Sequence, residues 1–144
     1  MTETPPPLNG RIIVQAERAT RAALDAHLAK TDTSFMTWIP LNLVATEDEI
    51  TIDALVEQLA TGLRIGTPEA RAAVDDLVAA GLVTITDTVQ LTDAGRATHQ
   101  EINGGLNKLI SRLYDGLAHD DLVAARRVLE TLTIRARAEL VKAS

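Results

Sequence analysis

The segment Thr67–Leu77, TPEARAAVDDL, holds side chains of the types that read DNA. Arg71 can donate paired hydrogen bonds to the edge of a guanine, and Glu69 can accept one from the amine of a cytosine. Arginine and hydroxyl groups at the turn before such a helix can donate to phosphate oxygens. The residues that we expect to contact DNA, if the chain binds it, are Arg64, Thr67, Glu69, Arg71 and Thr88.

The charge around these residues is unfavourable for DNA. Between Thr51 and Leu91 there are two basic residues, Arg64 and Arg71, and six acidic ones, and the whole chain has a net charge of -6. Counterion release supplies much of the affinity for DNA, and a typical specific binder makes about six to ten phosphate contacts. Backbone N–H groups at a helix start can hold phosphates without charge. This charge balance argues against nonspecific binding to nucleic acid but is compatible with sequence-specific binding.

Catalytic chemistry finds no support in the sequence. The chain has no cysteine, which excludes disulfides, thiolate metal sites and cysteine nucleophiles. His27, His99 and His119 are far apart, and none has a partner at metal-ligand spacing. No glycine-rich phosphate loop or nucleophile motif occurs. We therefore expect no enzyme activity, no catalytic residue, no metal site and no cofactor.

The start of the chain, MTETPPPLNG, lacks the apolar region of a signal peptide, and no apolar run approaches the ~20 residues that span a bilayer. We therefore expect a cytoplasmic protein without a membrane span. The prolines of Thr4–Pro7 predict an extended, flexible arm over residues 1–7. The rest, with 46% hydrophobic residues in a chain of 144, fits one domain of ordinary size.

Two helices are expected before residue 51. In Leu8–Lys30, apolar residues recur at helical spacing and give one apolar face, made of Ile12, Ala16, Ala19 and Ala23. Residues 31–45 predict a second helix, capped by Ser34 or Thr37. Pro40 is tolerated there in the first turn and otherwise kinks the helix. The apolar residues of this segment, Phe35, Met36 and Trp38, can be plain core residues.

Two further helices, joined by a turn that contains glycine, predict a helix-turn-helix. Thr51 is expected to cap the first, whose apolar residues recur every three or four positions. Thr67 is expected to cap the second, with Pro68 in its first position and Gly81 in the left-handed conformation at its end.

A short hairpin is expected to follow. Leu82–Thr86 and Val89–Leu91 alternate apolar and polar residues, which leaves Asp87 and Thr88 as a two-residue turn. This pattern predicts a small wing beside the helix-turn-helix.

The chain closes with two helices that carry long apolar stripes, capped by Thr92 and Asp120. The stripes consist of Ile102, Leu106, Leu109, Leu113 and Leu117 in the first helix and of Leu122, Leu129, Leu132, Ala136 and Leu140 in the second. An exposed stripe of this length needs a partner, and a symmetric dimer buries two stripes with one self-complementary patch. We therefore predict a homodimer.

In this order the elements resemble those of the MarR family of bacterial transcription regulators, over nearly the whole chain. The most specific part is LVAAGLV at Leu77–Val83 followed by LTDAGR at Leu91–Arg96, which is similar to the family's LTxxGR entry to its long fifth helix. The resemblance implies a mainly α fold, in which a winged helix-turn-helix with a short two-stranded wing, residues 51–91, is flanked by dimerisation helices in residues 8–50 and 92–144.

The resemblance also implies partners. Family members are homodimers that place two recognition helices in successive major grooves of a pseudo-palindromic DNA operator, usually as repressors released by a small aromatic ligand. Family pockets lie between the dimerisation helices and the winged helix, which implies His27, Phe35, Met36 and Trp38 as ligand-binding residues. A lone histidine such as His27 can equally be exposed or already satisfied.

Two departures from the family pattern keep a second function open. The wing lacks the arginine of the family's Asp-x-Arg element, and Ala72 and Asp76 stand where family recognition helices carry basic residues. The chain is then either a ligand-responsive, sequence-specific DNA-binding regulator, or a winged-helix dimer that has lost ordinary DNA binding and serves as a protein- or small-molecule-binding module.

Overall fold

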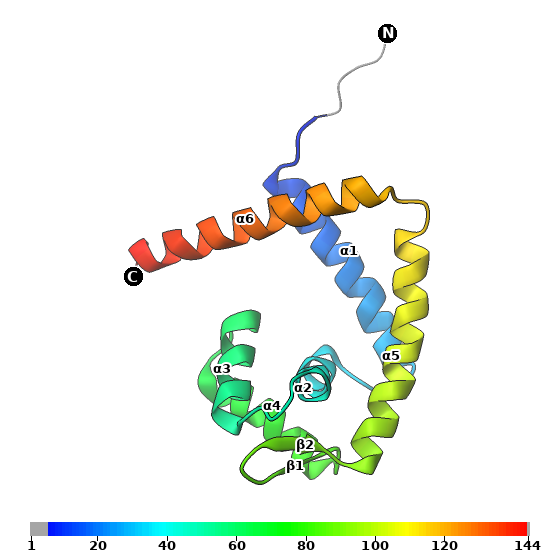
Figure 1. The fold of residues 1–144 in the computed structure, drawn as a ribbon, viewed down its shortest axis with the longest axis vertical. Coiled ribbons are helices and arrows are strands. Elements are labelled where there is room, and N and C mark those ends of the chain that lie inside the picture. Colours follow the sequence, from blue (N-terminus) through cyan, green and yellow to red (C-terminus); the bar gives the residue numbers. More distant parts are fainter. Residues whose placement is uncertain (1–5, 144) are drawn as a thin grey trace. The chain divides into compact units, whose positions relative to one another are not determined.

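A computed structural model describes residues 6–143, in which six helices and one hairpin follow one another (Figure 1). The elements are α1 Gly10–Ala29, α2 Phe35–Thr46, α3 Ile52–Leu63, α4 Thr67–Ala79, β1 Val83–Ile85, β2 Val89–Leu91, α5 Asp93–Tyr114 and α6 His119–Ala143. The mainly α fold class with a small two-stranded wing is confirmed. Residues 1–5 of the expected arm lie outside the described residues, and Pro6 and Pro7 precede the first helix.

The chain divides after residue 107 into two compact units. In the first unit α2 is the central helix, because it contacts α1, α3, α4 and β2 (Figure 1). The largest fully buried side chains are Leu28, Leu41, Leu55, Leu59, Leu77, Ile102, Val74, Val83 and Pro40. They come from α1 to α5 and the wing, so one core holds the helix-turn-helix, the wing and the first half of α5 together.

Polar residues cap the first three helices as their positions require. Asn9 accepts a hydrogen bond from the N–H of Ile12 at 3.0 Å, and Thr51 accepts one from Ala54 at 3.1 Å. Ser34 caps α2 by accepting from Thr37 at 3.3 Å, so Ser34 and not Thr37 is the cap. Pro40 lies in the second turn of α2 rather than the first, where its missing N–H removes one helical hydrogen bond.

Three expected boundaries are wrong by one to three residues. Thr67 does not cap α4: the N–H of Ala70 bonds to the carbonyl of Gly66 at 3.0 Å, so the helix begins with Thr67 and Pro68 takes its second position. Asp120 does not cap α6, which begins at His119 and places that carboxylate in its first turn. Leu117 lies beyond the end of α5, after Gly116 at φ +79°.

The wing has a three-residue turn, not the expected two. Val83 pairs with Leu91, and Ile85 pairs with Val89, which leaves Thr86, Asp87 and Thr88 between the strands. The N–H of Thr86 donates to the carbonyl of Thr88 at 2.9 Å and closes this turn. The N–H of Val89 donates to the carbonyl of Ile50 at 2.8 Å, so β2 is held on its other edge by the segment before α3.

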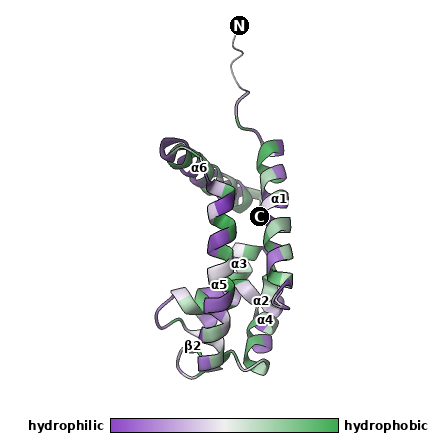
Figure 2. Cartoon of the chain, turned by 90° about the vertical axis from the view of Figure 1, so that its right-hand side faces the viewer, coloured by the Kyte–Doolittle hydropathy of each residue, from purple (hydrophilic) through white to green (hydrophobic). Residues whose placement is uncertain are grey.

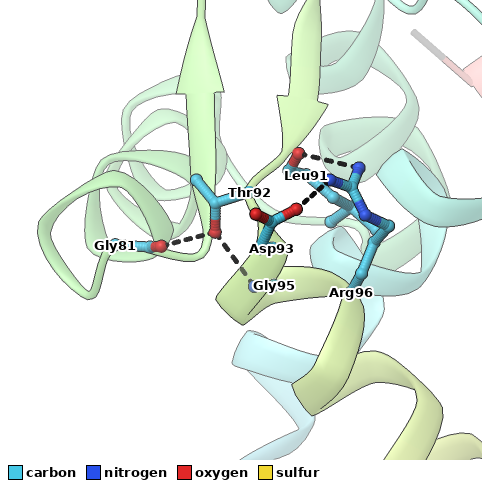
Figure 3. Close-up of polar contacts among 6 residues, drawn as sticks. All are labelled: Gly81, Leu91, Thr92, Asp93, Gly95 and Arg96. Atoms are coloured by element: carbon cyan, nitrogen blue, oxygen red, sulfur yellow. Dashed lines mark hydrogen bonds and ion pairs between the residues drawn. The ribbon is translucent and has the colours of Figure 1, made fainter.

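The joint between the wing and α5 is built around Thr92 (Figure 3). Its hydroxyl donates to the carbonyl of Gly81 at 2.7 Å and accepts from the N–H of Gly95 at 2.9 Å, which confirms it as the cap of α5. Its own N–H donates to the carbonyl of Leu82 at 3.0 Å. Through these three hydrogen bonds, Thr92 connects the end of α4, the wing and the start of α5.

The expected apolar faces of α1 and α6 are mostly exposed within the described chain. On α1, Ala23 is half-buried, whereas Ile12, Ala16 and Ala19 are exposed. No described residue of α6 is buried, and Figure 2 shows that the helix carries both hydrophilic and hydrophobic residues. No helix between residues 6 and 143 is long and apolar enough to cross a membrane.

Candidate functional site

The turn between α3 and α4 is set by Arg64 in a left-handed conformation. Arg64 has φ 56° and ψ 46°, and its N–H donates to the carbonyl of Ala60 to end α3. A non-glycine residue pays about 1–2 kcal/mol for this conformation. Within residues 6–143 the Arg64 guanidinium has no hydrogen-bond or ion-pair partner, and the side chain is exposed. It is therefore available to hold a phosphate.

Replacing Arg64 with glycine separates the backbone role from the side-chain role. We expect Arg64→Gly to raise the free energy of unfolding by about 0.5–1 kcal/mol, because relief of the left-handed strain exceeds the extra chain entropy of glycine. Urea unfolding at fixed protein concentration measures this change. A loss of stability would contradict it and would show that the side chain makes a stabilising contact.

The N-terminus of α4 is left open for an anion. Gly66 precedes the helix, no side chain caps it, and Thr67 and Glu69 are exposed in its first turn. The first N–H groups of a helix have no partner within it and carry partial positive charge. Pro68 has no N–H to offer. The backbone of Thr67 and Glu69 can therefore receive a phosphate, although the Glu69 carboxylate competes for the same end.

Arg71 lies on the exposed face of α4 and is paired within its own helix. Its Nε is 3.3 Å from Oδ1 of Asp75, one turn later. It also lines an open hollow of about 370 Å³ between α3 and α4, together with Thr67 and with Asp53 and Glu57 of α3. Arg71, the candidate side chain for reading a base, therefore lies close to acidic side chains.

Of the expected DNA-contacting residues, Arg64, Thr67, Glu69 and Arg71 lie on one stretch of backbone, from the end of α3 to the second turn of α4. Thr88 lies apart from that stretch, in the turn of the wing, where its hydroxyl accepts from the amide of Gln90 at 3.2 Å. The other end of α4 is closed by Gly81 at φ +77°, as expected. There the N–H groups of Gly81 and Leu82 donate to the carbonyls of Val78 and Leu77.

A second cluster joins α2 to α5. The rings of Trp38 and His99 stack at a centroid distance of 5.2 Å with 13° between their planes. The Nε2 of His99 donates to Oδ1 of Asn42 at 2.9 Å, because an amide oxygen can only accept. Burial lowers the pKa of His99. This histidine is therefore held neutral between the two helices at neutral pH.

His99 gives the fold a dependence on pH. A lowered folded-state pKa means that the unfolded chain binds the proton more tightly, so stability is complete above the unfolded-state pKa of about 6.5 and falls as the pH drops through it. We expect thermal denaturation between pH 7 and pH 5 to show a steeper loss of stability than in His99→Gln. Parallel curves for the two proteins would contradict a role for His99. Glu47, Asp48, Glu49 and Arg96 are the charged residues that line a hollow together with His99.

The structure gives the expected ligand-binding residues different surroundings. Trp38 is buried against His99, whereas Met36 is 37% exposed. The Arg21 guanidinium lies 3.4 Å above the ring centre of Phe35, a cation–π contact. The ring of His27 packs on Gly105 of α5, where a Cβ atom would lie 2.7 Å from its Cε1. His27, Phe35 and Trp38 thus all serve the packing of α1, α2 and α5.

Several of these contacts have no signal in the sequence. His99 and Asn42 are 57 residues apart, and nothing in their spacing pairs them. The Arg71–Asp75 pair, by contrast, has the i,i+4 spacing of a helical ion pair and could have been inferred.

The helix-turn-helix, the hairpin beside it and the long helix that starts at Thr92 define a winged helix-turn-helix protein. No protein-family model matches the sequence, and no curated protein matches it significantly. Solved structures do match. The MarR family protein Rv2887 of Mycobacterium tuberculosis, in complex with DNA, is 17% identical with a TM-score of 0.68, over 88% of this chain and 98% of that chain.

Two further structures match to a similar extent. CouR from Rhodococcus jostii RHA1, bound to p-coumaroyl-CoA, is 17% identical with a TM-score of 0.72, over 85% of this chain and 89% of that one. The transcriptional regulator PA3341 is 24% identical with a TM-score of 0.73, over 90% and 97%. At these identities the likeness concerns the fold, and the fold of this chain is that of the MarR family transcriptional regulators.

Proposed function

We propose that this protein is a homodimeric, sequence-specific DNA-binding transcriptional regulator, most simply a repressor, that responds to a small ligand. The observation that supports it best is the exposed start of α4, with Arg64, Thr67 and Arg71 on one stretch, in a fold that matches a DNA-bound MarR family protein over 88% of the chain. In this proposal α4 enters the major groove, Arg71 reads a base edge and Arg64 holds a phosphate. Glu69 and Thr88 lie at the margins of the contact.

Fluorescence anisotropy with the chain's own upstream DNA and a scrambled duplex tests this proposal. We expect sub-micromolar binding that prefers the upstream duplex, and a loss of at least about 25-fold in Arg71→Ala, because each dimer would lose two base contacts. Arg127→Ala removes an exposed arginine of α6 instead and is expected to leave the preference unchanged. Equal binding of both duplexes, or no binding at low salt, would overturn the proposal.

The dimer in this proposal is formed by the apolar stripes of residues 8–50 and 92–144. Its support is the set of large apolar side chains that α1, the end of α5 and α6 leave exposed in a single chain. Such a surface needs a cover, and a second copy supplies it with the matching stripe.

The ligand in this proposal is a small aromatic molecule that binds near His27, Phe35, Met36 and Trp38. The support is that these aromatic and polar groups lie where α1, α2 and α5 meet, with the Arg21 cation over Phe35 to attract an acidic group. Trp38 is the one tryptophan of the chain, so its fluorescence during titration with aromatic acids reports binding. A signal that never saturates would argue against the site.

A second function is favoured by the charge of the same surface. Arg71 is already paired with Asp75, and Asp53 and Glu57 line the hollow beside it. These carboxylates repel phosphates and suit a winged-helix dimer that binds a protein or a small molecule instead of DNA. Absence of DNA binding together with an intact dimer would support this second function.

A further inference from the structure

Small apolar residues follow one line along the exposed side of α4. The buried side of this helix consists of Ala70, Ala73, Val74 and Leu77. Pro68, Ala72 and Ala79 are exposed, and they are spaced four and seven residues apart. This spacing corresponds to about one and two helical turns, so the three residues share the side that faces away from the core. None of the three has a long side chain that would keep another molecule away from the helix.

Ala72 is the member of this line that is best placed to meet a base. A recognition helix contacts base edges in the major groove mainly with its N-terminal residues. Ala72 is in the second turn of α4, directly after Arg71, whereas Ala79 is the last residue of the helix. Pro68 lies one turn before Ala72 and extends the apolar surface towards the start of the helix.

The major groove presents one apolar group that a methyl side chain can contact, the 5-methyl group of thymine. Guanine, cytosine and adenine present hydrogen-bonding atoms there, which an alanine would cover without offering a partner. A methyl side chain at the bottom of the contact therefore favours thymine over the other bases.

Building on the proposed function, we propose that Ala72 is a specificity-determining residue that packs on the 5-methyl group of a thymine. Each half-site of the operator then carries a thymine close to the base that Arg71 reads. This role also gives a physical meaning to a departure from the MarR family pattern, in which a basic residue stands at the position of Ala72. One polar base contact is replaced by an apolar one.

Replacement of thymine by uracil in the upstream duplex tests this inference, because it removes the 5-methyl group and keeps the base pairing. Each thymine is replaced in turn, in both half-sites together, and binding is measured by fluorescence anisotropy. Loss of one buried methyl contact lowers affinity about fourfold, so a symmetric replacement should lower it about 15-fold for a dimer. We expect one thymine per half-site to show this loss.

Ala72→Gly removes the other methyl group of the same contact. At the sensitive position, its ratio of thymine to uracil affinity should fall from about 15 to near one. Both affinities belong to one variant, so the lower helix propensity of glycine affects them alike. Ala79→Gly makes the same change on the same side of α4 at its far end, and it should keep the wild-type ratio.

The inference can fail while the proposed function stands. If the wild type prefers its upstream duplex but no thymine in it depends on its methyl group, Ala72 does not read thymine. This measurement needs no protein variant and is therefore independent of how Ala72→Gly folds. A ratio that persists in Ala72→Gly, or that falls equally in Ala79→Gly, would also overturn the inference. If the wild type binds no duplex, both the regulator function and this inference are wrong.

Discussion

Gly95→Ala is expected to lower the free energy of unfolding by about 3 kcal/mol and the melting temperature by about 10 °C. Gly95 is buried in the first turn of α5. A Cβ atom there would overlap the carbonyl oxygen of Leu82 and lie 3.0 Å from its carbonyl carbon. That carbonyl belongs to the backbone and accepts a hydrogen bond from the N–H of Thr92, so it cannot move without breaking the joint at Thr92.

Gly104→Ala is the matched control for this effect. Gly104 lies inside the same helix, and a Cβ atom built on it meets no other atom within 4 Å. Alanine at this site should raise the free energy of unfolding by about 0.5–1 kcal/mol through helix propensity. Chemical denaturation of both variants at one protein concentration measures the contrast, and equal stabilities would contradict the close packing of Gly95 on Leu82.

Leu129→Asp is expected to dissociate the proposed dimer and raise its dissociation constant at least about 100-fold, because each copy would bury an unpaired carboxylate. Leu129 is in the middle of α6 and belongs to its apolar stripe. Its side chain is 42% exposed in the single chain, so the charge should leave the fold of the monomer intact. Sedimentation velocity measures the mass, and circular dichroism checks that the variant is folded.

Ala138→Asp introduces the same charge on the opposite side of α6. Nine residues separate Ala138 from Leu129, which is two and a half helical turns. Ala138 is exposed, so this variant should keep the wild-type mass. A monomeric wild type, or a Leu129→Asp variant that stays dimeric, would contradict an interface through this stripe.

Local chemistry explains why much of the fold could be predicted. Thr51, Gly81 and Thr92 occupy the cap positions expected of them, since each satisfies backbone groups only a few residues away. The alternation of Val83–Ile85 and Val89–Leu91 likewise predicted two strands whose pairing needs no distant residue. Such signals come from residues that are close together in the sequence, so they can be recognised without the tertiary structure.

The wrong helix starts and the wrong turn length arise where alternative local structures differ little in free energy. Thr67 and Asp120 are good caps, yet the helices begin at Thr67 itself and at His119. A cap contributes about 1 kcal/mol, which packing of the rest of the helix can override. The turn of the wing includes Thr86 in addition to the expected Asp87 and Thr88, because the two strands pair in a register that places Ile85 opposite Val89.

The sequence by itself determined the order of helices, the winged helix-turn-helix and the acidic character of the candidate recognition surface, because periodicity, caps and charges are properties of neighbouring residues. Only the tertiary structure decided which distant residues meet. It places His99 against Trp38 and Asn42, and it packs Gly95 so closely on the backbone carbonyl of Leu82 that a Cβ atom would not fit there. These contacts depend on how whole helices pack, and no spacing along the chain encodes them.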